Sequence, residues 1–504
     1  MTATSHLEDF QAFLSNDLCA FAAASLEVTD PIGHARFVSN WHQQVLAYHL
    51  ERVERGECRR LLVLAPPRSF KSHTASVAFP AWVLGRNPAR RILCASHSLD
   101  LAKKLAGDCS AVMRSDFYCE VFPGVQIERD RDVEIATRQR GSRYATSIGG
   151  PAVGRGSDIW ILDDLHKPED IYSDELRDRP YRWLTETAMT RLDDKATGAI
   201  VVIMQRLHID DIASKLIATG DWEVVELPAI AAVDTLHSLG PHRTHLFRAG
   251  EYLQPDREGR IVLDEIRRGM GTLPFNAQYL QAPQDMSGGV VEVDWIHRYD
   301  GTMTPLPTDY VLQSWDAAIS DELTADWSVC TTWIWRGGVA HLVDVWRDRR
   351  PLPQLLPIAM ELCRRWSPDE VVIETNGIGL AFHQSLLERV RLQSGDRRLR
   401  RVLDRGQGLV ARTGRGEHWS LAEVLFRKQS NSQGKLERLI ACTPQMEDGR
   451  VKFPTQAPWL ATYMRELLTF NGRSGNDDQV DSTSQALQRL RPRRNGGVLN
   501  INVY

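Results

Sequence analysis

Residues 61–72, Leu-Leu-Val-Leu-Ala-Pro-Pro-Arg-Ser-Phe-Lys-Ser, join a short apolar run to a loop that ends in lysine and serine. The run predicts a buried strand, and the loop leads into a predicted helix at 74–84. Such a loop suits nucleotide phosphates, because backbone N–H groups bind them, a lysine reaches the β- and γ-phosphates and a hydroxyl binds Mg²⁺. Lys71 and Ser72 supply the last two groups.

The loop departs from the common glycine-rich form at two positions, where Ala65 and Phe70 stand. The change at Phe70 is the larger one, because glycine adopts positive φ without strain. Arg68 is predicted to add positive charge at the γ-phosphate in the transition state. The residues predicted to bind the nucleotide in this loop are Pro67, Arg68, Ser69, Phe70, Lys71 and Ser72.

A second apolar run, 159–162, delivers two carboxylates, Asp163 and Asp164. Asp163 is expected to hold Mg²⁺ together with Ser72, and Asp164 to orient the attacking water as a catalytic carboxylate. Gln205 ends a further strand and is a candidate for sensing the γ-phosphate. Together the loop and the acidic pair predict an ATPase site with ATP and Mg²⁺ as cofactors.

A second set of acids lies in the C-terminal half. Asp316 and Glu374 each end a predicted strand, and Asp477 and Asp478 start the last predicted helix, with Asp481 one turn beyond. Carboxylates from separate elements suit hard cations, so we predict two Mg²⁺ or Mn²⁺ ions that act on a phosphodiester. The order strand-Asp, hairpin, helix, strand-Glu, helix-Asp is that of ribonuclease H-like nucleases.

Roles in this acidic set are predicted as follows. Asp316, Glu374 and Asp478 are expected to be catalytic, and all of Asp316, Glu374, Asp477 and Asp478 are candidate metal ligands. The sequence does not decide between Asp477 and Asp478. For each acid alone, a surface carboxylate or a helix cap is the simpler interpretation, and the ordered set favours a nuclease.

The chain of 504 residues exceeds what one hydrophobic core accommodates. Strand and helix patterns alternate in both halves, and the alternation in the N-terminal half predicts a mostly parallel sheet. The predicted fold class is α/β, with an N-terminal P-loop (ASCE-type) ATPase domain and a C-terminal ribonuclease H-like nuclease domain. The predicted divisions are an N-terminal helical segment (1–35), the ATPase domain (36–245), a connector (246–304), the nuclease domain (305–490) and a flexible C-terminal tail (491–504).

Charge and composition restrict the partners. The net charge is −4, which argues weakly against nucleic-acid binding, but nine arginines stand between 389 and 415. This segment is either a solvated loop or a patch along a phosphate backbone. No stretch is long and apolar enough to span a membrane, the N-terminus is not a secretory signal, and eight cysteines without a CxxC pair predict reduced thiols.

With these motifs in place, the chain resembles the large terminase subunit of tailed phages and prophages, from about 37 to 487. The stretches that carry the resemblance are Trp41-His42, Pro66–Ser72, Ala95–Ser98, Gly154–Asp158 with Asp163-Asp164, Met204–Asp211, Phe275–Tyr279 and Asn476–Asp481. Each is modest alone, and their order is specific.

The resemblance implies an ATPase that drives double-stranded DNA into an empty prohead and a metal-dependent endonuclease that cuts concatemers. It supports the roles given above and assigns Gln205 and Arg206 to a motif that couples hydrolysis to motion. The implied partners are double-stranded DNA, a small terminase subunit and the portal protein, on which the subunits form a homo-oligomeric ring. The implied location is the cytoplasm of a bacterial host, without membrane attachment.

Three other functions are compatible with parts of the sequence. A ribonuclease H-like recombinase or repair nuclease with a vestigial P-loop domain is favoured by the missing loop glycines. A helicase-nuclease needs motifs of a second motor domain, and the sequence has one P-loop. A non-enzymatic scaffold leaves both acidic sets unexplained.

Overall fold

The computed structural model describes residues 3–30, 39–150, 155–318, 327–375, 379–394, 420–421, 424–430, 433–473 and 477–491. The arginines from 397 to 415 and the tail beyond residue 491 lie outside these ranges. The chain forms two compact units, unit 1 (1–267 and 272–284) and unit 2 (268–271 and 285–504). The change of unit falls within the predicted connector, and the other predicted divisions remain predictions.

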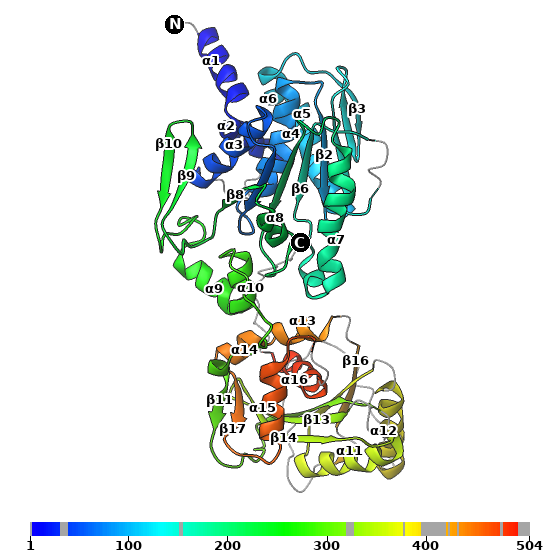
Figure 1. The fold of residues 1–504 in the computed structure, drawn as a ribbon. Coiled ribbons are helices and arrows are strands. Elements are labelled where there is room, and N and C mark those ends of the chain that lie inside the picture. The colour runs from blue at the N-terminus through cyan, green and yellow to red at the C-terminus, as the bar shows by residue number, and fades with distance from the viewer. Residues whose placement is uncertain are drawn as a thin grey trace. The chain divides into compact units, whose positions relative to one another are not determined.

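Eight of the described strands of unit 1 form a sheet in the order β3-β4-β5-β2-β6-β7-β1-β8 (Figure 1). All neighbours from β5 to β8 are parallel, and β3 and β4 add an antiparallel edge. The strands are β1 (Arg60–Leu64), β2 (Arg91–Ser96), β3 (Ile127–Arg131), β4 (Glu134–Thr137), β5 (Ser142–Ser147), β6 (Ile159–Asp163), β7 (Ala199–Met204) and β8 (Glu223–Glu226).

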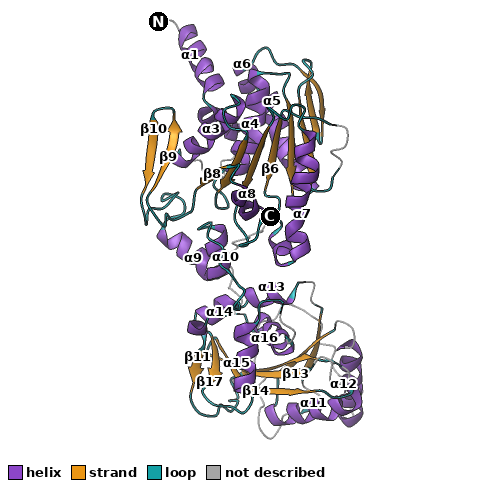
Figure 2. Ribbon diagram, in the orientation of Figure 1, coloured by secondary structure: helices purple, strands orange, loops and turns teal. Residues whose placement is uncertain are grey.

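Helices cover both faces of this sheet (Figure 2). They are α1 (Ala3–Asn16), α2 (Leu18–Thr29), α3 (Trp41–Glu54), α4 (Phe79–Arg86), α5 (Leu99–Arg114), α6 (Asp116–Val121), α7 (Asp174–Trp183), α8 (Ile212–Thr219) and α10 (Thr272–Gln278), with turns η1 (His73–Ala78), η2 (Pro168–Tyr172), η3 (Leu184–Ala188) and η4 (Met189–Arg191). The region 230–305, which shows little pattern in the sequence, contains a hairpin of β9 (Thr235–Gly240) and β10 (Arg243–Phe247) and the helix α9 (Arg260–Met270). No described helix has the length and apolar character that a membrane span requires.

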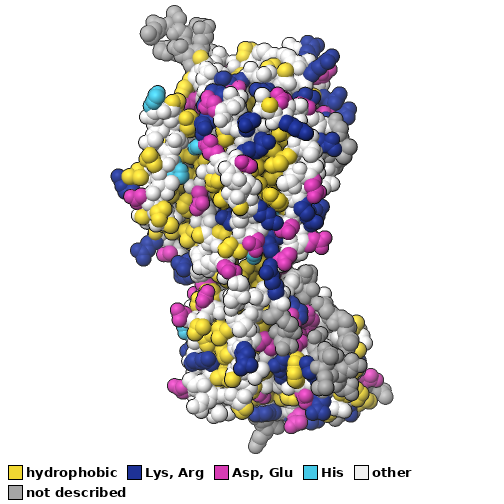
Figure 3. All heavy atoms as spheres, viewed as in Figure 1, with side chains coloured by type: hydrophobic (Ala, Val, Ile, Leu, Met, Phe, Trp, Pro, Cys, Tyr) yellow, Lys and Arg dark blue, Asp and Glu magenta, His cyan; other side chains and the backbone are white. Residues whose placement is uncertain are grey.

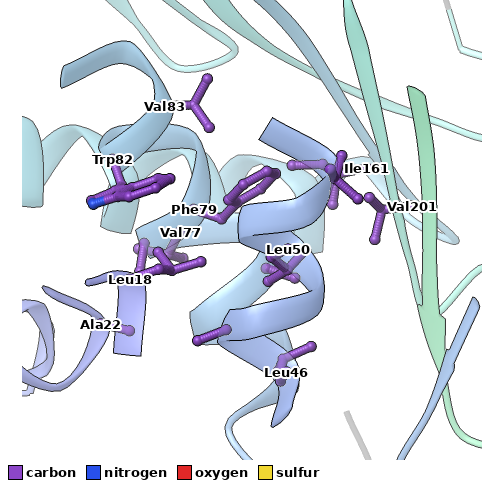
Figure 4. Packing of buried hydrophobic residues seen from close by; sticks show 14 of the residues in the cluster. Leu18, Ala22, Leu46, Leu50, Val77, Phe79, Trp82, Val83, Ile161 and Val201 are labelled. Atoms are coloured by element: carbon purple, nitrogen blue, oxygen red, sulfur yellow. The ribbon is translucent and has the colours of Figure 1, made fainter. Parts of the chain in front are cut away.

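The main core of unit 1 lies between the sheet and helices α2 to α5. Figure 4 shows Leu18, Leu50, Phe79 and Trp82 packed together on this side, with Ile161 of the sheet facing them. Burial of each such side chain contributes about 1.5–3 kcal/mol. This packing fixes the strand β1 and the helix that follows the predicted nucleotide loop.

That helix begins with a π-helical turn, η1. Pro80 contributes to this turn, because it has no N–H to give to the carbonyl of Ser76. The Ser76 carbonyl accepts instead from Nη2 of Arg143, at 3.3 Å. Arg143 belongs to β5 and is fully buried, so its side chain connects the π turn to the sheet.

The described strands of unit 2 form a seven-stranded sheet, β11-β17-β14-β13-β12-β15-β16. Strands β12, β13 and β14 are successively antiparallel, whereas β15 and β16 run parallel to β12. This is the ribonuclease H-like arrangement that the sequence predicts. The strands are β11 (His297–Tyr299), β12 (Tyr310–Asp316), β13 (Ser328–Arg336), β14 (Val339–Asp348), β15 (Glu370–Glu374), β16 (Leu425–Gln429) and β17 (Val451–Pro454).

The hairpin between β13 and β14 turns at Gly337 and Gly338, with φ of 57° and 85°. Two consecutive positive φ values match the tight turn that the sequence Arg-Gly-Gly predicts. Helices flank the sheet: α11 (Leu352–Trp366), α12 (Gly379–Ser394), α13 (Lys435–Ile440), α14 (Thr443–Glu447), α15 (Leu460–Thr469) and α16 (Asp478–Arg489), with the short turn η5 (Val293–Trp295).

Successive side chains of each strand in unit 2 point to opposite faces of the sheet. Trp315 and Ile373 pack in the apolar core with α11 and α12. Ser314, on the opposite face of β12, accepts from Gln485 of α16 at 2.9 Å. Asp316 and Glu374 share the parity of the second face, so both carboxylates fall on the side of α16.

Both signs of charge are interspersed over the face of each unit that Figure 3 shows. All eight cysteines are free thiols, as predicted.

Candidate nucleotide and metal sites

The loop of residues 65–72 leaves β1 and bends sharply without glycine. Arg68 and Phe70 have φ of 59° and 61°, in the left-handed region that favours glycine. Ser69 Oγ donates to the carbonyl of Pro66 at 2.8 Å and closes the bend. Arg257 donates to the carbonyl of Arg68 at 3.2 Å, and its guanidinium lies 4.8 Å from the Phe70 ring centroid. These contacts hold a backbone shape that glycine adopts without strain.

Ser72 stands at the start of the helix and faces Asp163 at the end of β6. Its Oγ donates to Asp163 Oδ1 at 3.0 Å, and Ser76 Oγ donates to Oδ2 at 2.7 Å. Asp163 is almost completely buried. Burial, with the neighbouring charge of Asp164, raises the pKa of Asp163 to about 7 against the opposing effect of the Ser76 hydrogen bond.

Asp164 follows at φ 43° and faces the lysine of the loop. Lys71 Nζ lies 3.5 Å from Asp164 Oδ2, and the Gln205 N–H donates to Oδ1 at 3.3 Å. The Asp164 carbonyl accepts from Nδ1 of His97, at 2.8 Å, at the end of β2. Because these parallel strands end at one edge, their terminal residues gather where α/β sheets bind ligands.

The strand β7 lies between β1 and β6, so Gln205 emerges between the loop and the acidic pair. The following Arg206 pairs with buried Asp211, with Nε 2.9 Å from Oδ2. The Arg206 N–H donates to Oε1 of Gln281 at 3.0 Å. Gln281 has φ of 56° and belongs to the last segment of unit 1.

The donors present fit a nucleotide with Mg²⁺. A hydroxyl (Ser72) beside a carboxylate (Asp163) is a hard-oxygen pair suited to Mg²⁺, and buried Lys71 supplies a cation for phosphate. Of the other predicted loop residues, Arg68 is exposed, Pro67 is partly exposed, and Ser69 is buried. The exposed Arg68 side chain and the backbone N–H groups of the loop are the remaining candidates for phosphate contacts.

In unit 2, three carboxylates converge on the α16 side of the sheet. One oxygen from each of Asp316, Glu374 and Asp481 lies within 4.8 Å of the other two. Burial raises the pKa of Asp316 well above its usual range, and the charges of Asp481, Glu374 and Asp478 add to the effect. We call Asp316, Glu374 and Asp481 the acidic trio. Its all-oxygen donor set fits a divalent hard cation.

The two acids predicted at the start of α16 take other places. Asp477 precedes the helix, and its Oδ1 accepts from Lys435 Nζ at 2.8 Å. Asp478 is buried, and its Oδ2 accepts from the N–H of Trp327 at 3.3 Å. Asp478 also lies close enough to affect Asp316. The sequence prediction omitted Asp481 from the ligands. Its position was a signal for including it, because a residue one turn beyond Asp477 and Asp478 lies on the same face of the helix as they do.

Two cations of α13 contact the acids. Arg438 is buried, with Nη2 2.6 Å from Asp481 Oδ1 and Nη1 3.3 Å from Glu374 Oε1. Lys435 Nζ lies 2.7 Å from Asp481 Oδ2. Burial raises the pKa of Asp481 to about 6, while the charges of Arg438 and Lys435 oppose the rise. Sequence reasoning did not identify either cation, because α13 lies outside every motif used.

Helix α16 itself is polar and buried over most of its length. Ser482 Oγ donates to the carbonyl of Ser314 at 2.8 Å, and Thr483 Oγ1 lies 2.7 Å from the Tyr463 hydroxyl. These bonds replace the apolar stripe that usually holds a helix against a sheet. They fix the position of Asp481 relative to Asp316.

Comparison with known families supports this description of unit 2. Residues 313–490 match the model of the terminase RNaseH-like domain. That segment is therefore a terminase RNaseH-like domain, and the predicted resemblance to large terminases is confirmed. No curated protein sequence matches the chain.

Several solved structures are similar to the chain at low identity. The large terminase of a thermophilic bacteriophage, in complex with ADP, shares 9% identity over 87% of this chain and 98% of its own, with a TM-score of 0.43. The HK97 bacteriophage large terminase shares 11% identity over 94% and 99%, with a TM-score of 0.35. The large terminase nuclease of a second thermophilic phage, G20c, with bound cobalt shares 17% over 39% and 94%, with a TM-score of 0.27.

Proposed function

We propose, starting from the terminase RNaseH-like domain at 313–490, that this chain is the large subunit of a viral DNA-packaging motor. Unit 1 hydrolyses ATP to move double-stranded DNA into a prohead, and unit 2 is an endonuclease that cuts concatemeric DNA. The observation that carries this proposal is the presence of two separate sites in one chain. One pairs Lys71 and Ser72 with Asp163 and Asp164, and the other is the acidic trio.

In the nucleotide site, each polar group has a distinct task. Lys71 neutralises the β- and γ-phosphates, while Ser72 and Asp163 hold Mg²⁺, which offsets charge on the phosphates. Asp164 orients the attacking water and accepts its proton, and the Gln205 N–H fixes that carboxylate. Arg68 is placed at the exposed turn of the loop, where it adds positive charge during transfer.

In the nuclease site, Asp316, Glu374 and Asp481 hold one or two divalent cations, Mg²⁺ or Mn²⁺. Such cations activate water and stabilise the leaving oxygen of a phosphodiester. Asp478 lies beside this set and acts on Asp316 through its charge. Asp477 is held by Lys435 at the entrance to the helix.

The proposed partners follow from the same function. They are double-stranded DNA, a small terminase subunit that selects it, and the portal protein on which several copies assemble as a ring. The proposed location is the cytoplasm of a bacterial host. A recombinase or repair nuclease with a vestigial P-loop is less well supported, because Lys71 lies beside Asp164 and Ser72 beside Asp163, which keeps the groups proposed to bind phosphate and Mg²⁺ together.

The test uses the full-length protein and two activities. Lys71→Ala is expected to abolish DNA-stimulated ATP hydrolysis and to leave Mn²⁺-dependent plasmid cleavage within about twofold. Asp316→Ala is expected to have the reverse effect. If both folded variants lose both activities, the model of two separate sites is wrong; a wild-type chain that cuts DNA without hydrolysing ATP supports the vestigial alternative.

A further inference from the structure

A tryptophan and two arginines lie at the edge of the unit 2 sheet where β12 ends. Trp327 immediately precedes β13, Arg347 lies near the end of β14, and Arg349 follows that strand. Val329 pairs with both Asp316 and Arg347, which places the arginine at the same edge as the acid. We call Trp327, Arg347 and Arg349 the tryptophan cluster.

Both arginines stack on the indole ring. The guanidinium carbons of Arg347 and Arg349 lie 4.3 Å and 4.1 Å from the Trp327 ring centroid. Stacking uses the flat face of a guanidinium and leaves the N–H donors at its rim. The ring therefore holds two positive charges in place without consuming their hydrogen-bonding capacity.

The tryptophan cluster is joined directly to the nuclease site. The backbone N–H of Trp327 donates to Asp478 Oδ2 at 3.3 Å, and Asp478 acts on Asp316 through its charge. The residue whose ring carries two guanidinium groups therefore contacts the nuclease acids through its backbone. Because carboxylates repel a DNA backbone, a nuclease needs fixed cations beside its acids to hold the strand.

The arginines also have donors to spare. Arg347 has an acidic neighbour, Glu466, at 3.8 Å. Within the part of the chain that the structure describes, Arg349 makes no ion pair, and the Nε atoms of both arginines are buried without an acceptor. A guanidinium without a carboxylate partner keeps its charge for a phosphate, whose oxygens accept charge-assisted bonds.

We propose that the tryptophan cluster binds a backbone phosphate of the DNA strand next to the bond that is cut. Arg349 is the principal contact, Arg347 assists it, and Trp327 positions both. The contact is with phosphate rather than a base, because guanidinium groups already lie over the indole ring on which a base would stack. This inference rests on the proposed nuclease function and adds the surface that holds its substrate.

The experiment uses the full-length protein with Arg349→Ala and Trp327→Leu. Binding of a short fluorescein-labelled DNA duplex is followed by anisotropy over a NaCl series without divalent metal, and Mn²⁺-dependent cleavage gives kcat and KM. The matched control is Arg365→Ala. Arg365 also stacks on a tryptophan, Trp366, at 5.4 Å, but it ends α11 near the start of β15, away from Glu374.

Arg349→Ala is expected to lower the slope of log Kd against log[NaCl] by about one, since one phosphate contact is lost. We expect KM to rise about tenfold, the loss for one charge-assisted bond, with kcat within about twofold. Trp327→Leu is expected to change slope and KM in the same direction, and Arg365→Ala to change neither.

The inference is overturned if Arg349→Ala keeps the wild-type slope and KM while wild type cuts DNA; the proposed function then stands. It is also overturned if Trp327→Leu lowers kcat alone, because the backbone N–H bond to Asp478 is kept in that variant and the ring then acts on the acids rather than on DNA binding. If wild type neither binds nor cuts DNA with Mn²⁺ present, the proposed nuclease function fails together with the inference.

Discussion

Arg438 Nη2 lies 2.6 Å from Asp481 Oδ1, and both side chains are buried. The same guanidinium reaches Glu374 at 3.3 Å, so one cation connects two members of the acidic trio. Carboxylates that close together repel, and Arg438 offsets the repulsion in the folded protein.

Replacement of Arg438 by methionine removes that cation and keeps most of the side-chain volume. We expect unit 2 to lose about 3–5 kcal/mol of stability, the usual cost of leaving a buried charge without its partner. Mn²⁺ is expected to raise the unfolding temperature of this variant more than that of wild type, because the ion replaces the lost charge. Thermal unfolding with and without Mn²⁺ measures both effects, and an equal Mn²⁺ shift in the two proteins contradicts the interpretation.

Asp481 is predicted to be the metal ligand from α16. Asp481→Asn is expected to weaken Mn²⁺ binding by about 10–100-fold, a typical loss when a metal site is disturbed, and to reduce cleavage in parallel. Asp477→Asn is expected to have a smaller effect, because Asp477 pairs with Lys435 outside the trio. Isothermal titration with Mn²⁺ compares the affinities of the two variants. The control is Asp448→Asn, because Asp448 pairs with Arg450. Stronger weakening by Asp477→Asn would contradict the assignment.

Ser76 is predicted to position Asp163 for Mg²⁺. Ser76→Ala removes the donor to Asp163 Oδ2 and leaves Ser72 as the remaining hydroxyl on that carboxylate. The variant is expected to lose about 1–3 kcal/mol of stability, and ATP affinity should fall in Mg²⁺ but not in EDTA. Fluorescent-nucleotide titration separates the two conditions.

The control for that experiment is Ser110→Ala, which removes a similar hydrogen bond, from Ser110 to Asp130, elsewhere in unit 1. Equal losses of affinity with and without Mg²⁺ would show that Ser76 serves only the fold.

His73 is predicted to make unit 1 sensitive to acid. Burial lowers its pKa to about 4, while its hydrogen bond to the Ala22 carbonyl opposes the shift. The unfolded state therefore binds a proton that the folded state does not between about pH 6.5 and 4, so stability falls as the pH falls through this range. At pH 5 the cost is about 2 kcal/mol, from 1.36 kcal/mol for each pKa unit.

The measurement is the drop in unfolding temperature between pH 7.5 and pH 5.0. His73→Gln is expected to show a smaller drop than wild type, since glutamine keeps an N–H donor and does not titrate. Exposed His242, changed to glutamine, serves as the control. If the unfolding temperature of the His73 variant drops as much as that of wild type, other groups cause the acid sensitivity.

The strands that carry the sites could be predicted, because apolar runs specify strands and their ends. Asp316 and Glu374 end the strands β12 and β15, as predicted. The strands β3, β11, β16 and β17, toward the edges of the sheets, were not predicted. The π turn of η1 could not be predicted, because it depends on Pro80 and Arg143 acting from different elements. The polar helix α16 was predicted from its acids, but its burial depends on partners such as Tyr463 that no local pattern reveals.

The nucleotide site could be predicted more completely than the nuclease site. The loop around Lys71 and the pair Asp163-Asp164 lie at strand ends, where chain order predicts their meeting. Asp481 and Arg438 come together only through helix packing, and sequence spacing does not report which helix faces which. The assignment of Asp477 and Asp478 as ligands remains a prediction, and Asp477→Asn tests its first half.

The bond from the Arg206 N–H to Gln281 has a mechanical consequence. Gln205 holds Asp164, Arg206 follows it, and Gln281 stands just before Asp285, where unit 2 resumes. A displacement of Gln205 that reaches Arg206 acts on this hydrogen bond and so on the last segment of unit 1. The hydrogen-exchange rate of the Arg206 amide therefore reports whether that segment moves with the nucleotide site.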